Sequence, residues 1–366
     1  MRILSRISLA LLALWVIAAT PARAEKIWYP FEVEIFDPPF NAERQRHPGT
    51  YTPLDAAARP WRICVSIPHL KDEYWIAVNF GVFDEARRLG VALQVFEAGG
   101  YGNLETQRQQ ITDCMATDAD GLIVSAISGD GLNDLVAGYL AEGRPVVDLI
   151  NGLSVDGLTG RSAADYWDMA HATGRYLLET QDSGDGTVRV GWFPGPDGPA
   201  WADSGDAGFR SALEGSAFEI VVSARGDTGK TAQGELVEQA LDQHPDLDFI
   251  VGTTVTAEAA VPILRRRGLS DRIKVLAYYY GPGVHRGIGR GQIIAAPSDM
   301  QAIEARIAVD MVVRALEGSL ELRHVSPKIR DIDRSNIRDF DASTTLPPRG
   351  FRPIFSVNDW GTGNDE

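Results

Sequence analysis

The regular alternation of short apolar runs with amphipathic stretches constrains the fold of this chain more than any other feature. It begins near Trp61 and continues for most of the sequence. Apolar strands that are each followed by a helix are typical of parallel sheets covered on both faces. We therefore predict an α/β protein. The predicted strands are 62–68, 91–98, 121–127, 145–151, 188–193, 218–224, 249–255, 273–279 and 293–298.

The strands fall into two successive groups, which predicts two doubly wound lobes. The first lobe is expected to contain residues 61–158 and about 300–325, and the second residues 159–299 and about 326–342. Residues 25–60 show little periodicity and are predicted to form an N-terminal extension. Residues 343–366 are predicted to form a C-terminal tail without regular structure.

The N-terminus has the pattern of a secretory signal. Arg2 and Arg6 give a basic start, residues 9–19 are apolar but too few to span a bilayer, and residues 22–24 read Ala-Arg-Ala. We predict a signal peptide over residues 1–24 and an exported mature chain. No later segment is apolar for long enough to form a membrane helix.

The charge balance argues against polyanionic partners. The chain has a formal net charge of −15, and the predicted signal contains three arginines and no acidic residue, so its removal gives −18. An acidic surface of this kind repels nucleic acid and anionic lipid. We expect neither as a partner of the mature chain.

One stretch, SARGDTGKT at 223–231, resembles a phosphate-binding loop because a predicted strand precedes it and a predicted helix follows it. A nucleotide site also needs an apolar strand ending in an aspartate that holds magnesium. The strands at 249–255 and 273–279 offer none, and Asp148 belongs to the other lobe. We therefore expect no nucleotide at this loop.

Other motifs of enzymes and metal centres are weak. The histidines at 69, 171 and 285 lie in different predicted elements without ligand spacing, and Gly99–Gly102 lacks the full dinucleotide-binding pattern. No G-x-S-x-G sequence occurs. We predict a binding protein, neither an enzyme nor a holder of a cofactor or metal.

Aromatic side chains recur where predicted strands end or the following helices begin. Ring faces attract cations and their area excludes water, so a cluster of rings suits a ligand with a methylated, positively charged nitrogen. Asp72 and Asp299 are candidates for adding negative charge. Each ring taken alone is equally consistent with core packing, and Trp167 in particular fits a helical core pattern. The aromatic candidates are Tyr74, Trp75, Tyr101, Tyr166, Trp167 and the tyrosines at 278–280.

The two-lobed arrangement resembles the type I periplasmic binding proteins, in which two lobes close on a small ligand. Five segments narrow the resemblance to periplasmic sensors of trimethylamine N-oxide: LKDEYW at 70–75, EARRLGVALQVFEAGGYGNLETQ at 85–107, GPDG at 195–198, GTTVTAEAA at 252–260 and GFRPIF at 350–355. The similarity runs along most of the mature chain, and residues 70–107 are the most specific part.

This resemblance implies a periplasmic protein that binds trimethylamine N-oxide and associates with a sensor histidine kinase of a two-component system. By position it implies Tyr74, Trp75, Tyr101 and Tyr279 as ligand-binding residues, with Asp72 and Asp299 as less certain polar partners. Tyr166 and Trp167 compete for one further aromatic place, and spacing back from Met169 favours Tyr166. The main alternative is a solute-binding protein that delivers a methylated amine or sugar to an ABC transporter.

The predicted topology places the two cysteines, Cys64 and Cys114, close to each other. In a doubly wound sheet the crossover between the second and third strands passes over the first strand, which brings Cys114 toward Cys64. An exported chain permits a disulfide between them, whereas two buried thiols are the alternative.

Overall fold

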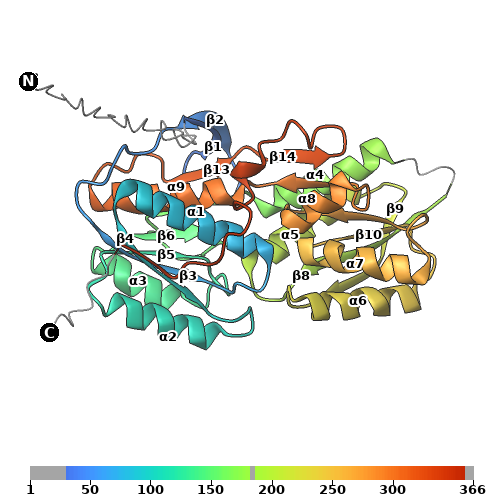
Figure 1. The fold of residues 1–366 in the computed structure, drawn as a ribbon, viewed down its shortest axis with the longest axis horizontal. Helices are drawn as coiled ribbons and strands as arrows, with labels where there is room; N and C mark the ends of the chain where they lie inside the picture. The colour runs from blue at the N-terminus through green and yellow to red at the C-terminus, as the bar shows by residue number, and fades with distance from the viewer. Residues whose placement is uncertain (1–29, 182–185, 359–366) are drawn as a thin grey trace, which may run out of the picture.

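The computed structural model describes residues 30–181 and 186–358, and the predicted signal peptide lies outside them. Two lobes, each a sheet with helices on both faces, stand side by side (Figure 1). The predicted α/β class and the two doubly wound lobes are confirmed.

A nine-stranded sheet forms the first lobe, with the order β15-β4-β3-β5-β6-β7-β13-β1-β2. Its six central strands run parallel. At one edge β1 and β2 pair antiparallel with their neighbours, and at the other edge β15 does so. The parallel strands are β3 (Arg62–Ile67), β4 (Ala92–Glu97), β5 (Gly121–Val124), β6 (Val146–Leu149), β7 (Gly160–Ser162) and β13 (His324–Pro327), and the edge strands are β1 (Phe31–Phe36), β2 (Arg46–Tyr51) and β15 (Ser356–Val357).

Four helices cover this sheet. The helices α1 (Glu73–Leu89) and α9 (Gln301–Leu316) pack on each other over one face, and α2 (Leu104–Met115) and α3 (Asn133–Ala141) lie on the other. Almost every residue of α9 is buried, because the helix lies between the sheet and α1. Gly81 permits this close approach, since a Cβ there would lie 2.4 Å from the carbonyl oxygen of Ala302.

The second lobe contains a four-stranded parallel sheet with the order β11-β10-β8-β9 and a separate antiparallel pair, β12-β14. Among the parallel strands, β4 lies on the outer side of β3 in the first sheet, and β9 lies on the outer side of β8 in the second. This is the doubly wound order. The strands are β8 (Val188–Gly195), β9 (Phe218–Arg225), β10 (Phe249–Gly252), β11 (Lys274–Ala277), β12 (Ala295–Ser298) and β14 (Arg330–Asp333). The helices are α4 (Tyr166–Thr180), α5 (Ala200–Leu213), α6 (Lys230–Gln243), α7 (Thr254–Arg267) and α8 (Pro282–Gly289).

Several predicted boundaries differ from those of the structure. Residues 160–162 and 324–327 are strands of the first sheet, so the first crossover between lobes comes just before Tyr166, another comes between β13 and β14, and the chain returns to the first lobe between β14 and β15. The predicted strand at 293–298 pairs with β14 instead of joining the four-stranded sheet. These pairings join residues far apart in the sequence, and short-range periodicity does not record them.

The N-terminal extension and the tail are also more ordered than predicted. Residues 31–51 form a hairpin that adds two strands to the first sheet through β13. Ser356 and Val357 pair with β4, and Asn79 of α1 exchanges two 2.8 Å hydrogen bonds with the backbone of Ile354. The ring of Phe351 packs against Phe80, with centroids 5.3 Å apart. The tail therefore fastens the outer side of α1.

Candidate functional site

A small cavity lies between the lobes where the carboxyl ends of both parallel sheets face each other. The free space inside it is about 10 Å³, close to the minimum that one water molecule needs, against about 300–1,000 Å³ for sites of drug-sized ligands. The rings therefore close on each other here, and even a ligand of few atoms requires the lobes to part. It is lined by Asp72, Tyr74, Trp75, Tyr101, Asn151, Tyr166, Trp201, Thr228 and Tyr279.

Three aromatic rings of the lining come from the first lobe. Tyr74 and Trp75 occupy the first turn of α1, whose position is set by Asp72: its carboxylate caps the helix by accepting from the backbone N–H of Trp75 at 3.1 Å. Tyr101 follows β4 in the loop before α2. All three rings are buried.

The other three rings come from the second lobe. Tyr166 is the first residue of α4, Trp201 lies in the first turn of α5, and Tyr279 follows β11. Asp165 caps α4 by accepting from the backbone N–H of Trp167 at 2.9 Å, which orients the start of that helix. Each lobe therefore supplies three of the six rings, and neither lobe forms the cavity alone.

The rings contact one another mostly edge to face. The centroids of Tyr74 and Tyr279 are 5.3 Å apart at 75°, and those of Trp201 and Tyr279 are 5.9 Å apart at 85°. Tyr166 lies 5.5 Å from Trp201. Such arrangements are favourable between aromatic quadrupoles and hold the rings in place.

The Tyr101 hydroxyl is the polar group best placed to meet a ligand. Its oxygen accepts from Nε1 of Trp201 at 3.1 Å and from Nδ2 of Asn151 at 3.3 Å. A phenol oxygen that already accepts from two N–H groups directs its own proton elsewhere. Among the described residues this hydroxyl donates to no acceptor, and Tyr101 lines the cavity, so its proton can point into the cavity.

Asp72 is the one acidic side chain in the lining. Its residue is 8% exposed, and burial raises the pKa of its carboxyl from 3.8 to about 7, with Glu258 and Asp227 adding to the rise and the hydrogen bond from Trp75 opposing it. Near neutral pH this group can hold or release a proton. It can therefore donate a hydrogen bond when neutral or attract a cation when charged.

Asp299 does not line the cavity, although the sequence made it a candidate for ligand contact. It lies behind two of the rings, where its Oδ2 accepts from the hydroxyl of Tyr74 at 2.6 Å and from that of Tyr166 at 3.4 Å. Burial raises the pKa of Asp299 to about 6, and it raises the pKa of the neighbouring Glu304 well above its usual range. Asp299 therefore supports the rings from behind.

Trp167 is the other candidate outside the cavity. Its ring stacks on His171 with centroids 4.5 Å apart, and the guanidinium of Arg44 lies 4.3 Å from its centre. Adjacent residues on a helix point about 100° apart, so only one of Tyr166 and Trp167 can face inward. The structure selects Tyr166.

Among the three consecutive tyrosines, only Tyr279 lines the cavity. The hydroxyl of Tyr278 donates to the carbonyl of Pro194 at 2.6 Å inside the second lobe, and that of Tyr280 meets Nδ1 of His285 at 2.8 Å. Sequence reasoning missed Trp201. Its place after the strand 188–193, at the opening of a helix, is the same signal that identified the other rings.

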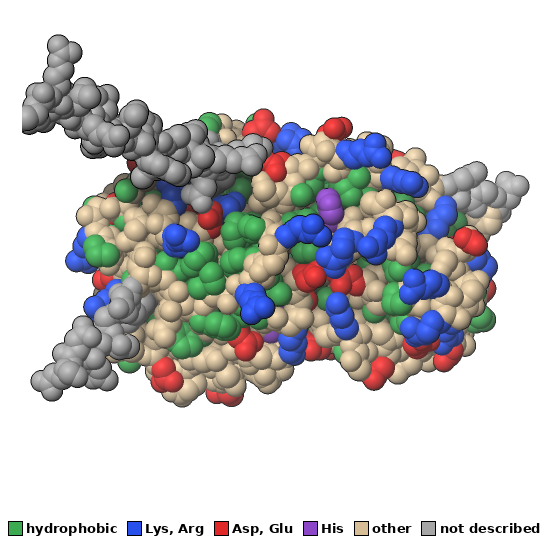
Figure 2. Space-filling view, viewed as in Figure 1, with side chains coloured by type: hydrophobic (Ala, Val, Ile, Leu, Met, Phe, Trp, Pro, Cys, Tyr) green, Lys and Arg blue, Asp and Glu red, His purple; other side chains and the backbone are tan. Residues whose placement is uncertain are grey.

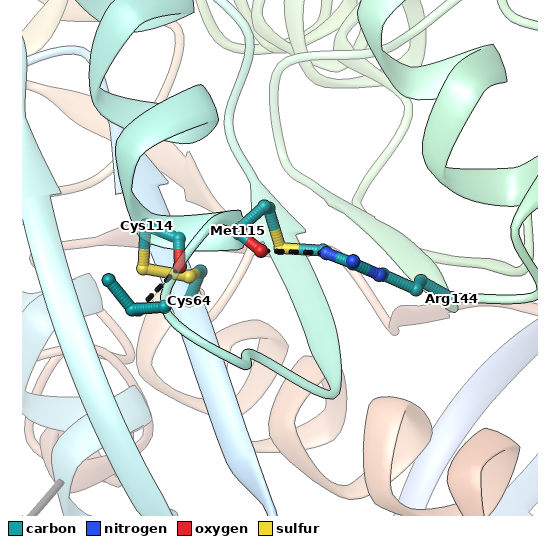
Figure 3. Close-up of a disulfide and its surroundings, with 5 residues drawn as sticks. Cys64, Cys114, Met115 and Arg144 are labelled. Carbon is teal, nitrogen blue, oxygen red and sulfur yellow. Dashed lines mark hydrogen bonds between the residues drawn. A yellow bond between two sulfur atoms is a disulfide. The ribbon is translucent and has the colours of Figure 1, made fainter.

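The two cysteines form a disulfide in the structure, between the middle of β3 and the end of α2 (Figure 3). Both residues are buried in a hydrophobic cluster of the first lobe. Arg144 donates to the carbonyl of Met115, next to Cys114, at 2.7 Å. The cluster contains none of the residues that line the cavity, so the disulfide belongs to the scaffold of the first lobe.

A second, larger hollow of about 210 Å³ lies beyond Tyr166 and Trp201, toward the N-terminal hairpin. Arg44 and Arg161 reach it, but each is paired with a carboxylate, Asp165 and Asp148 respectively. Within the described ranges no group of three or more His, Cys, Asp or Glu side chains is placed to hold a metal ion.

Comparisons with known proteins agree with the fold. Residues 63–320 match the family model described as the periplasmic binding protein domain. The chain is 35% identical over 311 residues to the periplasmic protein TorT of Escherichia coli (strain K12), covering 83% of this chain and 86% of that protein.

Two solved structures are also similar along most of the chain. An ABC transporter solute-binding protein from Bradyrhizobium sp. BTAi1 with bound bis-tris is 44% identical, with a TM-score of 0.79, and covers 91% of this chain and 100% of that one. The complex of the TorS sensor domain with TorT in the presence of TMAO gives 31% identity and a TM-score of 0.74, covering 81% of this chain and 99% of that one.

Proposed function

The chain belongs to the family of periplasmic binding proteins, and on that premise we propose that it binds trimethylamine N-oxide between its lobes and signals through a TorS-like sensor histidine kinase. The protein is periplasmic and acts by binding, as its relatives do, and not by catalysis. Among residues 30–181 and 186–358, no helix combines the length and the apolar character that crossing a bilayer requires.

The observation that carries the proposal is the closed cavity of six rings, three from each lobe. Trimethylamine N-oxide has a positive nitrogen within a shell of methyl groups, which electron-rich ring faces attract at about 0.5–2 kcal/mol per contact. A sugar would need many side chains that match hydroxyl groups. The polar side chains of the lining are few: Asp72, Asn151 and Thr228, beside the tyrosine hydroxyls.

The oxygen of the ligand only accepts hydrogen bonds, so it requires a donor inside the cavity. Tyr101 supplies one, because its oxygen already accepts from Trp201 and Asn151 and its proton remains available. Neutral Asp72 is a second donor, since its pKa of about 7 keeps part of the population protonated. In this arrangement the protein's rings face the methyl groups of the ligand, and a hydroxyl group of the protein donates to its oxygen.

The affinity has an upper bound. A ceiling of about 1.5 kcal/mol per non-hydrogen atom gives about 7.5 kcal/mol for the five such atoms of trimethylamine N-oxide, which corresponds to micromolar dissociation. Closing on the ligand moves the outer surfaces of the two lobes relative to each other. A kinase sensor domain bound across both lobes is then biased between signalling states.

Calorimetry tests the ligand directly. We expect micromolar binding of trimethylamine N-oxide, weaker binding of glycine betaine and no binding of ribose. Trp75→Ala should weaken binding, since it removes one wall of the cavity, and circular dichroism should show that the fold is kept. Tight ribose binding, or trimethylamine N-oxide affinity that is unchanged in Trp75→Ala, would contradict the proposal.

A second candidate is delivery of a methylated amine or a sugar to an ABC transporter. The observation that favours it is the similarity to the Bradyrhizobium solute-binding protein. The fold serves both uses. Retention of the purified protein by an immobilised TorS-type sensor domain separates them, because a transport protein has no reason to bind that domain.

A further inference from the structure

The loop at Gly226–Gly229, which resembles a phosphate-binding loop in sequence, is held by its own lobe in another way. The side chain of Gln233 donates to the carbonyl oxygens of Gly226 and Asp227, both at 2.9 Å, and accepts from the hydroxyl of Thr256 at 2.6 Å. Gln233 is fully buried. The Lys230 ammonium lies 3.4 Å from the carboxylate of Glu258. This loop is therefore rigid, and Thr228 projects from it into the cavity lining.

Thr228 meets a histidine of the opposite lobe. Its Oγ1 lies 3.0 Å from Nε2 of His69, which follows β3, and both residues are buried. The other ring nitrogen, Nδ1, accepts from the backbone N–H of Lys71 at 3.3 Å. Nδ1 therefore carries no proton, and Nε2 carries the single proton of a neutral imidazole and donates it to Thr228. A second proton on Nδ1 would point at the N–H of Lys71.

The same histidine contacts two walls of the cavity. Its ring lies edge-on to Tyr101, with centroids 5.4 Å apart at 79°, and to Trp75, at 6.2 Å and 76°. His69 thus joins the rings of the first lobe to Thr228 of the second. It touches no cavity space itself and acts as a positioning residue.

We propose that His69 and Thr228 form a latch between the lobes that holds while the imidazole is neutral, so that protonation of His69 opposes closure and weakens ligand binding. The inference rests on the proposed function for the identity of that ligand but not for the latch itself. A salt bridge at the surface, Lys71 to Asp227 at 3.1 Å, joins the same two loops but remains partly exposed and contributes little.

The electrostatics support this direction. Burial lowers the pKa of His69 to about 4, and the nearby Lys71 lowers it further while Asp227 opposes the change. A base whose pKa is lowered by closure favours the closed form above its ordinary pKa of 6.5. That preference is lost as the pH falls from 6.5 toward 4. Between pH 7.5 and 5.0 this single group weakens closure by up to about 30-fold.

Carboxyl groups near the latch work in the opposite sense and have to be separated from it. The pKa values of Asp72 and Asp299 are raised to about 7 and about 6, because both are buried, so their protonation favours closure in acid. The overall pH dependence of the wild type is the sum of these effects. A comparison with a variant that changes only the histidine isolates the latch.

His69→Gln keeps a neutral amide that can reach Thr228 and removes the titration. Titrations with trimethylamine N-oxide at pH 7.5 and 5.0 should show that the wild-type Kd rises at least fivefold more than that of His69→Gln. The exposed His47 provides the matched control: His47→Gln should follow the wild type. Equal pH dependence in wild type and His69→Gln, within about twofold, would overturn the inference.

A ligand-free measurement keeps the latch testable if trimethylamine N-oxide does not bind. Small-angle scattering should then show that lowering the pH from 7.5 to 5.0 shifts the radius of gyration of the wild type further toward larger values than that of His69→Gln. Absence of that difference rejects the latch, whereas failed titrations reject only the proposed ligand. Should His69→Gln not fold, Thr228→Val serves instead: it should open the protein already at pH 7.5, and an unchanged radius there would reject the latch.

Discussion

The hydroxyl of Tyr74 lies 2.6 Å from a carboxylate oxygen of Asp299 and so joins the first turn of α1 to the segment that crosses back from the second lobe. The same hydroxyl lies 2.9 Å from that of Tyr166, so the three groups form a buried polar triangle behind two cavity walls. Rings that face a ligand are thus fixed by hydrogen bonds on the side away from it.

Replacing Tyr74 by Phe should keep the wall and remove its fixation. A lost hydrogen bond to a buried charged group costs about 1.5–3 kcal/mol, and we expect a fall of this size in the free energy of unfolding at pH 7.5. Urea denaturation measures it. Tyr176→Phe is the matched control, because the hydroxyl of Tyr176 also donates to a carboxylate, that of Asp333 at 3.0 Å, but in a less buried place. A smaller loss for Tyr74→Phe than for the control would contradict the expectation.

Replacing Trp201 by Leu should weaken trimethylamine N-oxide binding by about 0.5–2 kcal/mol, the range of one ring contact to a cation. Loss of its N–H also frees the acceptor position on Tyr101. Isothermal calorimetry measures the change. The comparison is Trp167→Leu, whose ring stacks on His171 outside the cavity and whose loss should leave the affinity within about twofold. Equal effects of the two substitutions would contradict the assignment of Trp201.

Replacing Asp72 by Asn should stabilise the ligand-free protein in a pH-dependent way. Burial raises the pKa of Asp72 from 3.8 to about 7, because the charged carboxylate is disfavoured in the folded state. The folded state therefore incurs no penalty at this group below pH 3.8, and it loses stability as the pH rises from 3.8 through 7. Asn remains a good helix cap and carries no charge. The stability gained should be negligible at pH 4 and reach up to about 4 kcal/mol at pH 8. Thermal melts across this range test it, and a constant difference would refute it.

Removing the disulfide should destabilise the first lobe. It closes a segment of 50 residues, for which the loop-entropy account gives about 4 kcal/mol. We expect the Cys64→Ala, Cys114→Ala double variant to unfold at a lower urea concentration than the wild type. Reductant should shift the wild type in the same direction and leave the double variant unchanged. Mass spectrometry after alkylation, with and without reductant, establishes the bond itself.

The fold could be predicted because its main signals are local. Each buried parallel strand is apolar by itself, and each helix shows its own period, so the alternation predicts two doubly wound sheets. The strands of residues 31–51 and 356–357 escaped prediction because they are partly polar and pair with β13 and β4, which are distant in the sequence. Their stability comes from partners that no short window contains.

The sequence was enough to predict which loops line the cavity, but not in every case which side chain of a loop faces it. Tyr74, Trp75, Tyr101 and Tyr279 lie at one cavity because topology brings the carboxyl ends of the strands together, and their contact with a ligand stays a prediction. Topology does not say which way a ring turns. Asp299 therefore proved to be support for two rings, and the choice between Tyr166 and Trp167 depended on helix phase.

Because three of the six rings come from each lobe, binding of a ligand between them and the relative position of the lobes belong to one equilibrium. Coupling of this kind is reciprocal: a partner that prefers the liganded arrangement must lengthen the residence of the small molecule, and one that prefers the empty arrangement must expel it. A sensor domain that binds one arrangement selectively therefore also changes the ligand concentration at which this protein responds.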